Sequence, residues 1–176
     1  TLIRAIAVLR AMRAEMGEPP PRLVVLGVER ERAALARLAE RLDLRDDVDL
    51  AGYSDNPYAF MARAHAFALT SRYEGFGNVT VEALACGCPV VAVDSPGGQA
   101  EILAHGRYGR LVPPGDAEAV ARALFETLAE PPASAPLRAR AQRFSAERSA
   151  AALLALLRQT APPAAASPSP ERQDVP

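Results

Sequence analysis

Short apolar runs alternate with stretches of helical spacing along most of this chain, and this alternation constrains the fold more than any other feature. Such runs are typical of strands buried on both faces of a parallel sheet, and helix-containing crossovers join strands of this kind. The expected strands cover residues 23–26, 48–51, 66–69, 89–93 and 110–112. The expected helices cover residues 2–16, 29–42, 58–64, 78–85, 100–104 and 117–129, with one or two more within 137–158. The sequence therefore predicts an α/β domain with a doubly wound parallel sheet.

The two ends of the chain differ from this pattern. The first residue is Thr1 rather than Met, and it lies inside a helical pattern, which predicts that natural sequence precedes it. Residues 161–176 are rich in Pro, Ala and Ser, and we expect them to be a disordered tail. One domain of ordinary size, residues 1–160, is left between these ends.

Composition excludes several classes of function. The formal net charge of −1 provides no broad positive field for nucleic acid or an anionic membrane. A disulfide between Cys86 and Cys88 would be strained because one residue separates them, and no His or Cys cluster predicts a metal site. No apolar run reaches about 20 residues and no signal peptide is evident, so we expect a cytoplasmic protein.

The loop after the third expected strand carries the strongest chemical signal. Ligands of doubly wound sheets lie at the carboxyl ends of the strands, and this loop opens a helix there. Gly75 and Gly77 allow the backbone to approach a ligand closely, and the first helical turn offers N–H groups that suit a phosphate. Glu82, one turn further, can accept two hydrogen bonds from a ribose diol, and Glu74 can bind another hydroxyl-rich group. Two carboxylates around a diphosphate cradle match the layout of a nucleotide-sugar.

At these residues the chain resembles a known family. Seven residues separate Glu74 from Glu82, which is similar to the E-x7-E motif of the large retaining glycosyltransferase family with two facing Rossmann-like domains (GT-B fold, glycosyltransferase family 4 or group 1). The resemblance covers about residues 1–130 and includes the ordered segments Glu74–Asn78, Glu82–Ala85, Gly87–Ala92 and Gly97–Ile102. It implies the C-terminal, donor-binding half of a GT-B enzyme.

The resemblance also implies roles for individual residues. Glu82 would hold the ribose hydroxyls, and Glu74 would bind the donor hexose at the catalytic centre. The loop Gly52-Tyr53-Ser54 would contact the base, so Tyr53 and Ser54 are donor-binding candidates. Backbone N–H groups would meet the sugar and diphosphate in the segment formed by Gly75, Phe76, Gly77, Asn78 and Val79. The implied reaction transfers a sugar with retention by a front-face mechanism in which the leaving phosphate assists the acceptor hydroxyl, without metal or cofactor.

Three departures from the family pattern bear on activity. The usual Arg and Lys on the diphosphate belong to sequence before Thr1, and so does the acceptor-binding domain. The loop after the first strand reads Gly27-Val28-Glu29 instead of Gly-x-Gly, which puts a negative charge near the diphosphate side. We therefore expect the isolated chain to be inactive. The whole protein would meet a glycan or lipid-linked acceptor, and the inner membrane face peripherally, through its other half.

Structural interpretations compete with these functional ones. Glu82 alone would be a solvated helix residue, Phe76 could anchor the loop in the core, and Asn78 could be only a helix cap. His65 lies at a helix-to-strand junction and is interpreted as structural. Glu101 could belong to an active-site loop with the two glycines before it, or could begin a helix. A solvated helical face is expected for Arg138, Arg140 and Arg143.

Two other functions remain open on the sequence. A nucleotide-sugar epimerase also binds UDP-sugars between two domains of this kind, although the ordered run from Glu74 to Ile102 favours a transferase. A non-catalytic nucleotide-binding module is the third interpretation. A phospho-receiver would need clustered acids after the first strand, and Leu26-Gly27 lacks them. From the family, UDP-linked hexoses or N-acetylhexosamines are expected as donors in preference to GDP-mannose.

Overall fold

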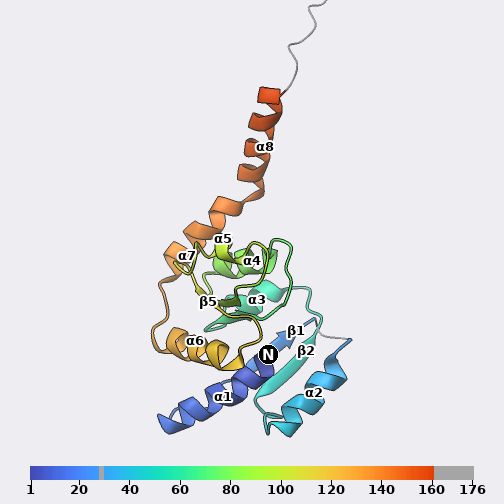
Figure 1. The fold of residues 1–176 in the computed structure, drawn as a ribbon, viewed down its shortest axis with the longest axis vertical. Coiled ribbons are helices and arrows are strands. Elements are labelled where there is room, and N and C mark those ends of the chain that lie inside the picture. Colours follow the sequence, from blue (N-terminus) through green and yellow to red (C-terminus); the bar gives the residue numbers. More distant parts are fainter. Residues whose placement is uncertain (28–29, 161–176) are drawn as a thin grey trace, which may run out of the picture. The chain divides into compact units, whose positions relative to one another are not determined.

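A computed structural model describes residues 1–27 and 30–160 (Figure 1). Val28 and Glu29, in the loop expected to depart from Gly-x-Gly, lie outside the described residues, as does the expected disordered tail 161–176. The chain divides into two compact units, Thr1–Arg143 and Phe144–Pro176. The first of these is called the main unit below, and the prediction of one domain over residues 1–160 stays a prediction.

Helices and strands alternate through the main unit as the sequence predicts (Figure 1). In chain order the elements of this unit are α1 (Leu2–Glu15), β1 (Leu23–Leu26), α2 (Arg32–Arg41), β2 (Val48–Gly52), α3 (Pro57–Met61), β3 (Phe67–Leu69), α4 (Asn78–Cys86), β4 (Val90–Val93), α5 (Gln99–Ile102), β5 (Arg110–Val112), α6 (Ala117–Ala129) and α7 (Ser134–Ala141). A 3-10 turn, η1 (Gln142–Phe144), and α8 (Ala146–Thr160) follow.

All strand pairs are parallel, which confirms the predicted α/β class. Among the described residues the hydrogen bonds form two ladders, β1–β2 and β3–β4–β5, where the sequence suggested one sheet. In the second ladder Phe67 pairs with Val90, and Val91 pairs with Arg110, so β4 lies between two neighbours. The carboxyl ends of β3 and β4 therefore lie side by side, and the loops that follow them leave from the same edge.

One hydrophobic core joins both ladders. All four residues of β4 are buried, as expected of a strand that is paired on both sides. Helices α1 and α6 lie against each other (Figure 1) and contribute the largest share of the buried side chains. The buried residues of this core include Ile3, Ile6, Leu9, Leu44, Val91, Val93, Val112, Val120 and Leu124.

Local capping explains where two helices begin. The side chain of Asn56 accepts a hydrogen bond from the Ala59 N–H at 3.2 Å, and Pro57 takes the first helical position of α3. Asp116 does the same for α6, accepting from the Ala119 N–H at 2.8 Å. The predicted start of α6 at residue 117 is confirmed, and α3 begins one residue before its predicted start at residue 58.

Helix α7 makes contacts that the sequence did not predict. Arg138 and Arg143 are exposed, as expected of a solvated face, whereas Arg140 is partly buried. Arg138 donates to the Cys86 carbonyl at 3.2 Å, and Arg140 donates to the Ile102 carbonyl at 2.8 Å and lies over the Tyr108 ring. Long arginine stems can bury against apolar surface while the guanidinium finds carbonyl partners, and spacing along the helix does not reveal this.

The second unit is represented by α8, whose Leu153, Leu154, Leu156 and Leu157 are each more than half exposed. Across residues 1–27 and 30–160, no helix combines the length and apolar character that a membrane crossing requires.

Candidate functional site

The loop predicted to bind the donor leads from β3 into α4, and we call Glu74–Gly77 the donor loop. Gly77 precedes the first helical residue with φ of +94°, a left-handed conformation that favours glycine. Asn78 is therefore the first residue of α4, and its interpretation as the cap was wrong. Gly77 supplies no side-chain cap, and the Thr80 N–H donates to the Gly77 carbonyl at 2.9 Å, so the N–H groups of Asn78 and Val79 are the ones available to an anion.

The structure places the predicted donor-binding residues around this helix start. Gly75, Phe76 and Asn78 are exposed, whereas Glu74, Val79 and Glu82 are partly buried. Glu82 lies in α4 one turn after Asn78. The helix therefore places the Glu82 side chain on the same side as its first N–H groups. Phe76 is 39% exposed and its ring contacts Gly98, so this side chain is not a buried anchor in the core.

A second loop packs against the donor loop, and we call its residues Ser95–Gln99 the glycine loop. A Cβ built on Gly97 would lie within 3.0 Å of the Glu74 carbonyl oxygen, and one built on Gly98 would come as close to the Phe76 carbonyl oxygen. Real Cβ atoms do not approach so closely, so the two loops can pack backbone to backbone only because both positions are glycine. Glu101, in contrast, is an exposed residue of the short helix α5.

Two buried polar residues that the sequence analysis did not single out connect these loops. Thr80 of α4 is fully buried and donates its hydroxyl hydrogen to Gln99 Oε1 at 2.8 Å, while Gln99 is 1% exposed. The remaining amide nitrogen, Nε2, lies against Gly77 in the space that a side chain there would fill. Since 19 residues separate Thr80 from Gln99, only the folded structure reveals this pair.

The loop expected to contact the base follows β2. The Gly27 N–H donates to the Gly52 carbonyl at 2.8 Å, which joins the loops after β1 and β2. Tyr53 is 76% exposed, and Ser54 Oγ accepts from the Asn56 N–H at 3.3 Å within the turn before α3. Tyr53 is therefore accessible to a ligand, while Ser54 also shapes its own turn. These two residues belong to a different strand ladder from the donor loop.

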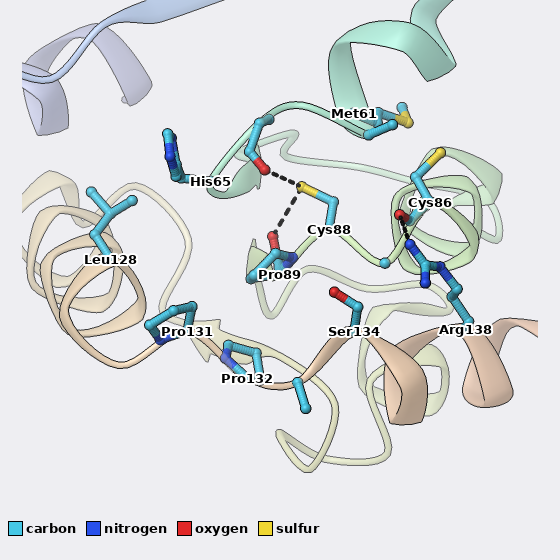
Figure 2. Close-up of a pocket in the computed structure, with 14 residues that line it drawn as sticks. Met61, His65, Cys86, Cys88, Pro89, Leu128, Pro131, Pro132, Ser134 and Arg138 are labelled. Carbon is cyan, nitrogen blue, oxygen red and sulfur yellow. Dashed lines mark hydrogen bonds between the residues drawn. The ribbon is translucent and has the colours of Figure 1, made fainter.

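A cavity of about 360 Å³ lies at the opposite, amino end of β4 (Figure 2). His65 and Arg138 line it together with both cysteines. Cys88 Sγ contacts the Ala64 carbonyl at 3.7 Å, and burial raises the pKa of this thiol to about 11. Burial also raises the pKa of Cys86. Both thiols are free and neutral at pH 7, so this cavity presents no activated nucleophile. Residues 1–27 and 30–160 contain no group of three or more side chains arranged to hold a metal ion.

The parallel strands and the helices that alternate with them form a Rossmann-like half of a GT-B fold. The chain belongs to the group 1 glycosyl transferases, whose family model matches residues 1–147.

Named relatives agree with this assignment. The chain is 35% identical over 169 residues, 90% of its length, to D-inositol 3-phosphate glycosyltransferase of Jonesia denitrificans, of which it covers 39%. It is 41% identical over 91 residues, 52% of its length, to a 4-alpha-N-acetylgalactosaminyltransferase of Campylobacter jejuni that acts on a diphospho-undecaprenol-linked saccharide, of which it covers 25%. The chain thus spans well under half of these relatives.

Solved structures share the fold. The Anabaena protein HepE in complex with UDP matches with a TM-score of 0.71 and 28% identity over 89% of this chain and 44% of that chain. Sucrose-phosphate synthase from Thermosynechococcus elongatus matches with a TM-score of 0.75 and 31% identity over 89% of this chain and 41% of that chain.

Proposed function

We propose that this chain is the donor-binding part of a glycosyltransferase that moves a sugar from a nucleotide-sugar to an acceptor hydroxyl with retention of configuration. The observation that carries the proposal is the start of α4, where Gly77 leaves the first N–H groups without a side-chain cap and Glu82 follows one turn later. Helix N-termini of this kind favour phosphate through both the free N–H groups and the helix dipole.

Each candidate residue has a role in this proposal. The Glu82 carboxylate accepts hydrogen bonds from the two ribose hydroxyls, and Glu74 accepts from hydroxyls of the transferred sugar at the catalytic centre. The exposed ring of Tyr53 is suited to stack on the base, with Ser54 beside it. The diphosphate and sugar meet the backbone between these groups, at Gly75, Phe76, Gly77, Asn78 and Val79.

We favour a UDP-linked sugar as the donor, and the named UDP complex of the related Anabaena protein supports this choice. In the proposed reaction the bond from the anomeric carbon to the UDP oxygen breaks as the acceptor oxygen attacks from the same face. The acceptor proton passes to the leaving phosphate oxygen, so no metal ion is required. The acceptor, a glycan or a lipid-linked saccharide, would bind to the rest of the protein in the cytoplasm or at the inner membrane face.

Nucleotide binding tests the donor site. A ligand-observed NMR titration of this chain with UDP, GDP and ADP should show preference for UDP. Glu82→Ala should weaken UDP binding by about 1.5 kcal/mol or more, roughly tenfold. Glu118→Ala is the matched control, because Glu118 is an exposed glutamate on α6, and it should leave binding unchanged. Failure of all three nucleotides to bind to this chain and to the full-length protein, or equal binding by Glu82→Ala and the unsubstituted chain, would contradict the proposal.

Retention of configuration at the anomeric carbon is tested with the full-length protein. Proton NMR of the first-formed product should show the anomeric configuration of the donor sugar, and activity should survive removal of divalent ions with EDTA. A product with inverted configuration would exclude retention but would not contradict the assignment of the nucleotide site. A product in which the nucleotide stays attached to an epimerised sugar would instead favour the epimerase.

A further inference from the structure

The amide of Gln99 presents an unexplained hydrogen-bond donor inside the main unit. Among residues 1–27 and 30–160, the buried side-chain nitrogen and oxygen atoms without a hydrogen-bond partner are Gln99 Nε2 and Ser95 Oγ. Both belong to the glycine loop, which packs against the donor loop. Buried polar groups are nearly always hydrogen-bonded, so two unpaired atoms in one loop point to a partner that arrives from outside the chain.

Thr80 fixes the direction of this amide. Because the Thr80 hydroxyl donates to Oε1, the two Nε2 hydrogens face the other way, toward Gly77. Gly77 is the residue before the first turn of α4, in which the N–H groups of Asn78 and Val79 also lack an intrahelical acceptor. The Gln99 Nε2 group and the free N–H groups of α4 thus both adjoin the same glycine.

From this arrangement we infer that Gln99 is a donor-binding residue whose side-chain amide donates a hydrogen bond to a phosphate oxygen of the nucleotide. This assignment rests on the proposed function of the donor loop. The amide nitrogen is shielded from solvent, so an oxygen reaches it only when the Gly77 backbone shifts. Glycine is the residue that can make such a shift at least steric cost, and any side chain at this position would occupy the space of the amide.

The chemistry favours a phosphate over a sugar hydroxyl at this position. An N–H donor that has no acceptor of its own gains most from an anionic oxygen, because charge-assisted hydrogen bonds are roughly twice as strong as neutral ones. The positive end of the α4 dipole acts at the same place and also favours an anion. Gln99 thereby adds a side-chain donor to a cradle otherwise made of backbone groups.

Comparing uridine with UDP isolates the contribution of the phosphates. In Gln99→Met, which has a similar length but no N–H, we expect UDP affinity to fall about tenfold while uridine affinity changes less than twofold. Gln142→Met is the matched control at an exposed glutamine and should change neither affinity. Equal weakening of uridine and UDP would show a purely structural role for Gln99 and overturn the inference, as would an unchanged UDP affinity.

A measurement on the unsubstituted chain keeps the inference testable if Gln99→Met does not fold. In a ¹⁵N-labelled sample, the side-chain amide signals of Gln99 should move downfield on addition of UDP and remain in place with uridine. No movement with saturating UDP would overturn the inference.

Glu82→Ala separates this inference from the proposed function. Glu82 is assigned to the ribose, so its loss should weaken uridine and UDP alike and leave the ratio of their affinities unchanged. If Glu82→Ala has no effect while Gln99→Met lowers UDP affinity selectively, the ribose assignment fails and the phosphate assignment stands. If UDP binds neither to the unsubstituted chain nor to the full-length protein, both are wrong.

Discussion

Replacement of Gly98 by alanine tests whether the donor loop and the glycine loop depend on direct backbone packing. Gly98 has an ordinary φ of −83°, so alanine at this position costs no backbone strain. Its new Cβ would nevertheless lie within 3.0 Å of the Phe76 carbonyl oxygen and 2.9 Å from the Phe76 Cδ2 atom. Overpacking costs about 1–3 kcal/mol, and we expect the upper part of that range because the nearest obstacle is backbone.

The net effect includes the unfolded chain. Exchanging glycine for alanine stabilises by about 0.4–1 kcal/mol when the native conformation permits it, through the lower entropy of the unfolded state. Gly98→Ala should therefore destabilise the main unit by roughly 1.5–2 kcal/mol. Gly75→Ala in the donor loop has neither a positive φ nor an atom within 4 Å of the new Cβ, and should be neutral or slightly stabilising.

A third variant isolates backbone strain. Gly17 has φ of +70° and no atom within 4 Å of the place that a new Cβ would take, so Gly17→Ala carries strain without overlap. This strain costs about 1–2 kcal/mol before the unfolded-state gain. Urea unfolding followed by circular dichroism should give the highest midpoint for Gly75→Ala, a lower one for Gly17→Ala and the lowest for Gly98→Ala. The first and last should differ by roughly 1 M at an m-value of about 2 kcal/mol/M. Equal midpoints for Gly98→Ala and Gly75→Ala would refute the close packing of the two loops.

Two further predictions concern stability. Asp116→Ala removes the 2.8 Å bond to the Ala119 N–H and should cost about 1 kcal/mol in urea unfolding, whereas Asp116→Asn keeps an acceptor and should cost less. The pKa of Cys88 is raised from 9.0 to about 11, so above pH 9 the unfolded state releases a proton that the folded state retains. The stability due to the neutral thiol is therefore complete below pH 9 and is lost as the pH rises through 11, and Cys88→Ala should show a smaller decline over that window. An identical pH dependence in both proteins would contradict the burial of this thiol.

The elements that the sequence predicted are those encoded by neighbouring residues. The apolar run Leu23–Leu26 and the cap at Asp116 are local signals, so strand and helix positions agreed with the structure within a few residues. The donor loop was also locally visible, because Gly75 and Gly77 stand between a strand and a helix. The binding roles of Glu74 and Glu82 remain predictions that the titrations above would test.

What the sequence did not predict depends on residues far apart in the chain. The Thr80–Gln99 hydrogen bond and the contact of Arg138 with the Cys86 carbonyl join segments that no periodicity relates. Likewise, Gly97 and Gly98 could be seen as turn glycines, but their necessity comes from the carbonyl oxygens of another loop. Side-chain partners across the fold are set by tertiary packing, and a single sequence carries no direct record of them.

The division of the strands into two ladders has a consequence for handling the protein. Among the described residues β1, β2, β3 and β5 are each paired along one edge, and β1 carries the exposed apolar side chain of Val24, which is 39% exposed. Unpaired apolar strand edges are templates for strand addition. Self-association of this chain at high concentration should therefore begin at β1, and a charged residue in place of Val24 is the substitution that should reduce it.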